Sequence, residues 1–166
     1  MTNEQLLHPA VKSALDTAHI IVRVLPCDSN FADTAAFNDK YGFSPDQSAN
    51  TILVVSKKVE PVKYAVCVVL ASTRLDVNKA VTKLLGVRKA SFADADTTKQ
   101  MTGMEIGGVT AVGISGLPIY VDRQVMAQPE VVMGGGNRTS KIIIDPQDLT
   151  KLPNVTLVDD LAKGAE

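Results

Sequence analysis

Apolar residues run almost without interruption through two stretches near the middle of the chain, residues 51–55 and 64–70. Both stretches are short and rich in β-branched residues, which predicts a strand in each. Neither alternates between apolar and polar positions, as a strand with one solvent-exposed face would. We therefore expect two neighbouring strands in a sheet that is covered on both faces.

Helical spacing of apolar residues distinguishes other segments. In residues 3–18, leucine, valine and alanine recur every three or four positions, and Asn3 is a candidate N-cap. Pro9 falls within the first turns, so this helix either begins later or bends there. Asp76 and Gly86 mark the beginning and the end of a second helix. Shorter helices are predicted over 33–40 and 94–101 and after Asp145, and further strands over 20–25, 109–112, 118–121, 131–133, 141–144 and 155–158.

This order of elements combines short connections between strands with helical crossovers, which is typical of α/β proteins. No repeat, low-complexity tract or linker interrupts it. We expect a single compact domain over residues 1–166, with its core over about 20–160. In this domain, helices should flank a mixed, mostly antiparallel β-sheet.

Composition narrows the classes of protein that fit. Of the 166 residues, 45% are hydrophobic and only 4% are aromatic, so the core must be aliphatic. The net charge of −1 excludes a protein that binds nucleic acid through its overall charge, and any such contact must use a local patch. The N-terminus is polar and no apolar run reaches membrane-spanning length, so we expect a cytoplasmic protein without a membrane partner. Cys67 lies within an apolar run, which predicts a buried, reduced thiol.

The usual catalytic motifs are absent from the sequence. His8 and His19 have no cysteine or second histidine at metal-ligand spacing, so both are interpreted as ordinary surface or structural residues. No G-x-S-x-G nucleophile motif occurs. The glycines of residues 103–108 resemble a phosphate-binding loop in spacing, but Val109 stands where that loop needs its lysine.

Two glycine-rich loops, residues 102–113 and 134–138, remain as candidate sites. Glycine allows another molecule to approach main-chain N–H groups closely, and the adjacent Gly107 and Gly108 could direct two N–H groups to one oxyanion. The alternative is a tight turn between two elements. Asn50 and Thr51 offer hydrogen-bonding groups where a buried strand begins, or they cap that strand locally.

Basic residues form a weaker pattern. Lys79 and Lys83 are four residues apart on one predicted helix, Arg88 and Lys89 follow, and Arg138 and Lys141 flank the second glycine loop. Such groups could hold phosphates or could simply form a solvated surface.

Several short segments together resemble the YbaK/EbsC-type aminoacyl-tRNA editing domains, which are related to the editing insertion of bacterial prolyl-tRNA synthetase. The similar segments occur in the family's order over about residues 30–150: Asn-Phe-Ala-Asp at 30–33, Pro-Asp-Gln-Ser-Ala-Asn-Thr-Ile-Leu-Val at 45–54, Leu-Asp-Val-Asn-Lys at 75–79, Ala-Asp at 93–94, Thr-Gly at 102–103, Gly-Gly-Val-Thr at 107–110 and Gly-Gly-Gly-Asn-Arg at 134–138.

The resemblance implies hydrolysis of the ester that joins a wrong, small amino acid to the 3′ acceptor end of a tRNA. A synthetase is a possible second partner, and no metal or organic cofactor is implied. The protein would act in trans, with main-chain donors and a size-limited pocket in place of a protein nucleophile. The implied catalytic residues are Asn50, Gly107 and Gly108, and the implied substrate-binding residues are Thr51, Lys79, Val109, Gly135 and Asn137.

Two positions depart from the family pattern. Asn50 stands where the cysteinyl-tRNA deacylase type carries a lysine. Asparagine keeps the hydrogen-bonding capacity at this position but lacks the positive charge. Ala111 replaces the proline of the family's loop after Gly107, so the loop is less restricted. The alternative to an enzyme is a non-catalytic tRNA- or ligand-binding module of the same fold. A protein–protein adaptor has no positive support in the sequence.

Overall fold

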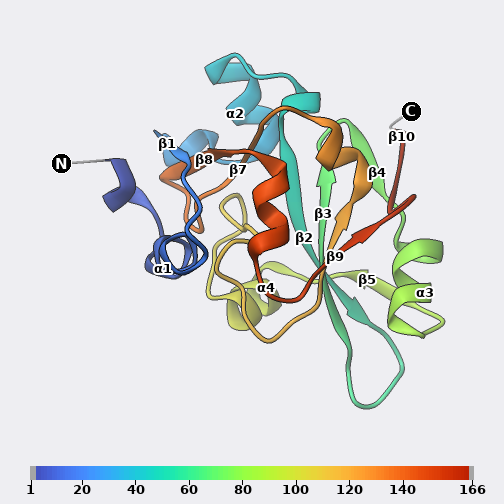
Figure 1. Ribbon diagram of the computed structural model, residues 1–166. Helices are drawn as coiled ribbons and strands as arrows, with labels where there is room; N and C mark the ends of the chain where they lie inside the picture. Colours follow the sequence, from blue (N-terminus) through green and yellow to red (C-terminus); the bar gives the residue numbers. More distant parts are fainter. Residues whose placement is uncertain (1–2, 165–166) are drawn as a thin grey trace.

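The computed structural model describes residues 3–164, and a five-stranded sheet lies at its centre (Figure 1). The strand order is β5-β2-β3-β6-β9. β2 pairs with β3 and β5 in the antiparallel sense, whereas β6 is parallel to both β3 and β9. The predicted mixed sheet is therefore confirmed. Its strands are β2 (Ala49–Ser56), β3 (Tyr64–Leu70), β5 (Ala90–Phe92), β6 (Ile119–Asp122) and β9 (Val155–Val158).

The remaining strands form two smaller sheets. β1 (Arg23–Pro26), β8 (Ser140–Ile144) and β7 (Val131–Gly134) pair in that order and are antiparallel throughout. A single bridge between Ser48 and Val132 joins this sheet to the start of β2. β4 (Thr73–Leu75) pairs with β10 (Ala162–Gly164). The bridge matters for the site because it brings β7 and β8 beside the beginning of β2.

Helical segments connect and cover these sheets. Asp76 and Asp94 accept hydrogen bonds from Lys79 N–H and Thr97 N–H, so both cap their helices as polar side chains at an N-terminus should. The α-helices are α1 (Pro9–Ala18), α2 (Thr34–Tyr41), α3 (Thr82–Leu85) and α4 (Ala95–Thr102). The short helices are η1 (Asn3–Leu6), η2 (Ser29–Phe31), η3 (Pro45–Gln47), the π-helix η4 (Val77–Val81), η5 (Arg123–Ala127) and η6 (Pro146–Lys151).

The first helix begins later than its apolar spacing alone indicates. Asn3 opens a separate 3₁₀ turn, and His8 caps α1 by accepting the N–H of Ala10 on Nδ1. Pro9 occupies the first helical position, where its missing N–H costs nothing. Of the two possibilities that Pro9 raised, the later start is the one observed, and Asn3 as the cap of this helix was wrong.

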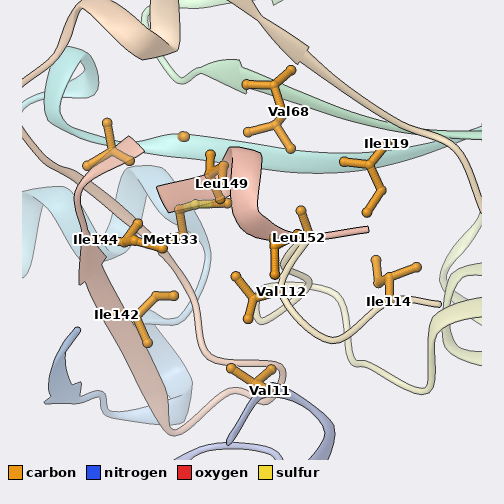
Figure 2. Packing of buried hydrophobic residues seen from close by; sticks show 14 of the residues in the cluster. Val11, Val68, Val112, Ile114, Ile119, Met133, Ile142, Ile144, Leu149 and Leu152 are labelled. Carbon is orange, nitrogen blue, oxygen red and sulfur yellow. The ribbon is translucent and has the colours of Figure 1, made fainter. Parts of the chain in front are cut away.

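Both faces of the central sheet are buried, as the continuous apolar runs predicted. On one face Val66 and Val68 join a large cluster that includes Val11 of α1 and residues of β7 and β8 (Figure 2). On the other face Ala65, Cys67 and Val69 pack with α3 and the end of the chain. Successive residues of β3 therefore contribute to different cores.

One predicted strand is absent. Residues 109–112 form no strand, although Thr110, Ala111 and Val112 are almost completely buried. This segment is irregular backbone that packs beneath α1, and Gly113, with φ +102°, leaves room for the main chain of Ala10. Apolar composition here reflects burial in the core and not strand pairing. None of the helices within residues 3–164 has the length and apolar character needed to cross a membrane.

Candidate functional site

The two glycine loops lie against each other. Gly136 N–H donates to the carbonyl oxygen of Gly108 at 2.7 Å. A Cβ on Gly108 would overlap with the backbone of Asn137, and one on Gly134 would lie 2.5 Å from the oxygen of Gly108. These main chains can approach so closely because neither carries a side chain at the contact. The first loop is thereby fixed to the end of β7.

Gly107 is at the corner of a tight turn. Gly108 N–H donates to the carbonyl oxygen of Glu105 at 2.8 Å, which closes a four-residue β-turn. Gly107 is the third residue of this turn and has φ +90°, as a type II turn requires. The turn interpretation of this loop is correct, but it does not exclude a site, because the turn also forms one wall of a pocket.

Two cationic side chains bind consecutive carbonyl groups of the turn. Arg138 Nη1 donates to the oxygen of Ile106 at 2.8 Å, and Lys141 Nζ donates to the oxygen of Gly107 at 2.7 Å. Arg138 also contacts Asp33 Oδ1 at 3.2 Å and the oxygen of Ser29. A trans peptide directs its N–H away from its C=O, so these contacts determine where the N–H groups of the turn point. The N–H groups of Gly107 and Val109 have no hydrogen-bond acceptor among residues 3–164.

Lys141 is buried in a way that is unusual for a lysine. Only 5% of its surface is exposed, and its Nζ also donates to the oxygen of Ala32 at 2.5 Å. Burial lowers the pKa of the ammonium group, and Cys27 and Asp33 act in the opposite direction. The two carbonyl contacts use two of its three N–H donors. The third donor has no partner among residues 3–164, and Lys141 is one of the residues that line the pocket.

The pocket lies between the start of β2, the glycine turn and the end of β7. It has a volume of about 270 Å³. β5 pairs with β2 only over residues 54–56, so the edge of β2 before Val54 faces the pocket without a strand partner on that side. The lining residues are Asp33, Thr34, Ala49, Asn50, Thr51, Ile52, Leu53, Phe92, Ala93, Thr98, Ile106, Gly107, Val109, Gly134 and Lys141.

Asn50 is held in one orientation by α2. The hydroxyl of Thr34 donates to Asn50 Oδ1 at 2.5 Å. Because the acceptor end of the amide is occupied, its Nδ2 donors are left for a bound molecule. The neighbouring Thr51 has a buried hydroxyl without a hydrogen-bond partner among the described residues, and it also lines the pocket.

The structure brings four of the eight candidate residues together in this pocket: Asn50, Thr51, Gly107 and Val109. Gly108 lies directly behind the lining, and its N–H is already used within the turn. We therefore replace Gly108 N–H by Val109 N–H as the second candidate main-chain donor.

The other three candidates lie outside the pocket lining. Asn137 stabilises its own loop, since its Oδ1 accepts from Thr139 and Ser140 and its Nδ2 donates to Leu6. Gly135 packs against Ser140 and accepts the N–H of His8. Lys79 is exposed on η4.

Thr34 is a pocket residue that sequence reasoning missed, and Lys141 was considered only as a possible phosphate contact beside the second glycine loop. A signal for Lys141 was present, because it is the one charged residue among the apolar positions 141–144 of a predicted strand. A charge in a strand of that kind is either at its exposed end or buried for a reason. No comparable signal marks Thr34, which reaches Asn50 only through the tertiary fold.

Nowhere in residues 3–164 do three or more histidine, cysteine or acidic side chains gather so that they could hold an ion. His8 is occupied as the cap of α1, and its Nε2 lies 3.1 Å from the oxygen of Gly103.

Comparison with known proteins places this geometry in a family. Residues 28–152 match the family described as the aminoacyl-tRNA editing domain, and this match spans three quarters of the chain, including every pocket residue. The chain belongs to that family. The resemblance noted in the sequence is thus confirmed for the family as a whole.

Solved structures agree with this assignment of the editing domain. The crystal structure of a candidate trans-editing enzyme for prolyl-tRNA synthetase has 25% sequence identity and a TM-score of 0.76, and the match covers 96% of this chain and 99% of that one. The hypothetical protein APE2540 shares the fold at 21% identity, with a TM-score of 0.80 over 93% of this chain and 99% of that one.

Proposed function

We propose that this editing domain is a hydrolase that acts in trans and cleaves the ester bond of a tRNA mischarged with a small amino acid. One observation carries the proposal: a pocket of about 270 Å³ is lined by Gly107 and Val109, whose N–H groups are unpaired among residues 3–164, and by the buried cation of Lys141, and its lining contains no serine, cysteine or histidine. The family and the neighbouring trans-editing structure support the substrate class. Such an activity belongs in the cytoplasm, where tRNAs are charged and used.

The chemical requirement is stabilisation of negative charge. Attack of water on the ester carbonyl produces a tetrahedral oxyanion, whose collapse breaks the bond to the ribose oxygen of the tRNA. The proton that the attacking water loses passes through solvent to that leaving oxygen, which gives the free amino acid and a tRNA with a free hydroxyl. Main-chain N–H groups and a cation that are already in position stabilise the oxyanion without reorganising. In our proposal the N–H groups of Gly107 and Val109 and the third N–H of Lys141 supply this environment. Asn50 Nδ2 orients the attacking water or the substrate's amino group, and Thr51 contributes to the wall of the pocket.

In our proposal, Lys141 supplies the positive charge that is missing at position 50. Asn50 lacks the charge of the lysine carried there by the cysteinyl-tRNA deacylase type, but Lys141 brings a cation to the same pocket from β8. A charge in a site of low dielectric constant acts strongly on a nearby oxyanion. We therefore assign the electrostatic role to Lys141 and a hydrogen-bonding role to Asn50.

Two exposed apolar side chains at the pocket suit the terminal adenosine. Phe92 is 58% exposed and Ile106 is 46% exposed, and both line the pocket. A base can stack on an exposed aromatic ring regardless of sequence. We place the adenine beside Phe92, with the amino acid further in.

The test is an assay of ester loss from tRNAs charged separately with Ala, Ser, Thr, Cys or Pro, with and without prolyl-tRNA synthetase. We expect at least one of these substrates to be hydrolysed faster than in buffer. No acceleration with any of them, in either condition, contradicts the proposal and favours a non-catalytic binding module. The arm with synthetase tests whether a carrier protein supplies part of the affinity.

A further inference from the structure

Six cationic side chains gather at the end of the central sheet that is remote from the glycine turn. They come from the loop between β2 and β3, from the end of α3 and from the residues before β5: Lys57, Lys58, Lys63, Lys83, Arg88 and Lys89. All six are exposed. Glu60 is the only acidic residue in segments 57–63 and 82–92. We call this group the basic surface.

Hydrogen bonds show that these segments are neighbours in space. Lys57 N–H donates to the oxygen of Lys89 at 2.9 Å, which continues the pairing of β2 with β5. Lys63 Nζ donates to the oxygen of Leu85 at 3.1 Å, which joins the β2–β3 loop to the end of α3. In Figure 1 this loop, β5 and α3 lie together on the side of the molecule away from α1 and β1.

The basic surface holds six of the eleven cationic side chains that have no counter-ion among residues 3–164; the other five are Lys40, Arg74, Lys79, Lys99 and Lys141. Over residues 3–164, no ion pair involves any of its six members, whereas Lys12, Arg23, Arg123, Arg138, Lys151 and Lys163 each pair with an aspartate or glutamate. A protein with net charge −1 has therefore collected unpaired positive charge in one place. Such a patch attracts a polyanion even when the whole molecule does not.

The basic surface is connected to the pocket by two strands. β2 leads from Asn50 and Thr51, which line the pocket, to Lys57, a span of roughly 23 Å at about 3.3 Å per residue. β5 leads from Lys89 to Phe92, so the exposed ring at the pocket lies about 10 Å from the nearest cation of the surface along the strand. Single-stranded nucleic acid is bound by aromatic rings, on which its bases stack, and by cationic side chains, which contact its phosphates. Phe92 and the nearby Lys89 and Arg88 offer both kinds of group.

We propose that the basic surface binds the phosphate backbone of an RNA whose 3′ end occupies the pocket. This rests on the proposed function, because it takes the pocket's occupant to be the end of an RNA. Lys79 extends the surface by one helical turn from Lys83, so its expected contact with phosphate belongs here and not in the pocket. The exposed Phe92 favours RNA over an acidic protein as the partner.

The test compares two triple variants that remove the same charge. The surface variant carries Lys58→Gln, Arg88→Gln and Lys89→Gln. The control carries Lys12→Gln, Arg23→Gln and Lys151→Gln, whose exposed ion pairs contribute little to stability. Binding of uncharged tRNA is measured over a range of salt concentrations. Each lost phosphate contact should reduce the slope of log affinity against log salt by about 0.7 to 0.9, the values for single-stranded and duplex nucleic acid.

We expect the slope of the surface variant to be smaller by about two to three, and its affinity for tRNA near 0.1 M salt to be at least about tenfold weaker. The affinity of the control should change by less than about twofold. The kcat/KM of the surface variant should fall for aminoacyl-tRNA and stay unchanged for aminoacyl-adenosine, which has no phosphate chain. Equal behaviour of the two variants would overturn the proposal. If the wild-type protein cleaves no ester but binds tRNA through this surface, the proposed hydrolase fails and the binding surface stands.

Discussion

Lys141 Nζ lies 2.7 Å from the carbonyl oxygen of Gly107, so a buried cation from β8 holds the turn that forms one wall of the pocket. The contact joins residues that are far apart in the sequence. It brings a buried charge next to the turn whose Gly107 N–H is a proposed donor, so the two features that the proposed reaction requires lie side by side.

Replacing Lys141 should damage catalysis more than binding. Lys141→Met keeps much of the side chain's length, removes its charge and leaves two buried carbonyl groups without a donor. We expect kcat to fall by about 100-fold, as for the loss of one oxyanion-stabilising group. Steady-state hydrolysis measures this, with Lys99→Met on the exposed face of α4 as the control. A variant that remains folded and retains full kcat would remove Lys141 from the proposed mechanism.

Because Thr34 orients Asn50, we expect replacement of Asn50 to reduce the rate more than replacement of Thr34. Asn50→Ala should reduce the rate by roughly tenfold or more if Nδ2 contacts the transition state. Thr34→Val keeps the shape of the side chain and removes only its hydroxyl, so we expect a loss of about three- to tenfold, the equivalent of one hydrogen bond. In the double variant the two losses should not add, because Thr34 acts through Asn50. Additive losses would separate the two residues.

Gly107 can be tested against a glycine that has the same backbone strain. Gly107→Ala and Gly116→Ala both place a side chain at positive φ, which costs about 1 kcal/mol of unfolding free energy. Only at Gly107 would the new Cβ overlap with Arg138 and lie 2.9 Å from Asp33 Oδ1, whereas nothing lies within 4 Å at Gly116. We expect Gly107→Ala to lose about 1–3 kcal/mol more in urea denaturation. Equal losses would show that the Arg138 side chain can move away from the new Cβ without a loss of unfolding free energy.

Phe92 should contribute to binding and not to the chemical step. Phe92→Ala removes the exposed ring at the pocket, and loss of one stacked base corresponds to about 1–3 kcal/mol. We expect KM for aminoacyl-tRNA to rise by about fivefold or more, with kcat little changed. Ile21→Ala is the matched control, since Ile21 is an exposed apolar residue outside this pocket. A fall in kcat without a change in KM would contradict the stacking role.

Cys67 makes the stability of the fold sensitive to alkaline pH. Burial raises the pKa of its thiol to about 12, from an ordinary value of 9.0. Between these two values the unfolded thiol loses its proton and the folded one keeps it, so the unfolded state gains as pH rises. The free energy of unfolding should fall by about 1.4 kcal/mol per pH unit in this window.

Urea denaturation at pH 8 and pH 10.5 measures this effect of Cys67. Cys67→Ala is expected to start less stable because it leaves a small cavity in the core. It should then lose about 2 kcal/mol less than the wild type between the two pH values. Parallel losses in the two proteins would mean that the folded state exposes this thiol.

Local patterns were sufficient to predict most elements of the fold. Apolar runs, helical spacing and polar caps involve residues that are near in sequence, and they predicted β2, β3, α4 and the capped segment after Asp76. Residues 109–112 were assigned to a strand because buried irregular backbone has the same composition as a buried strand. The division of strands into three sheets also depends on long-range pairing that composition does not encode.

The sequence by itself determined that two glycine loops and the Asn50–Thr51 pair belong to one family of editing domains, because their order along the chain is a local property. Only the tertiary structure decided which of those residues share a pocket. It moved Gly108, Gly135, Asn137 and Lys79 out of the lining and brought in Thr34 and Lys141. The physical reason is that hydrogen-bonding capacity is a property of a residue, whereas its availability depends on which distant groups already use it.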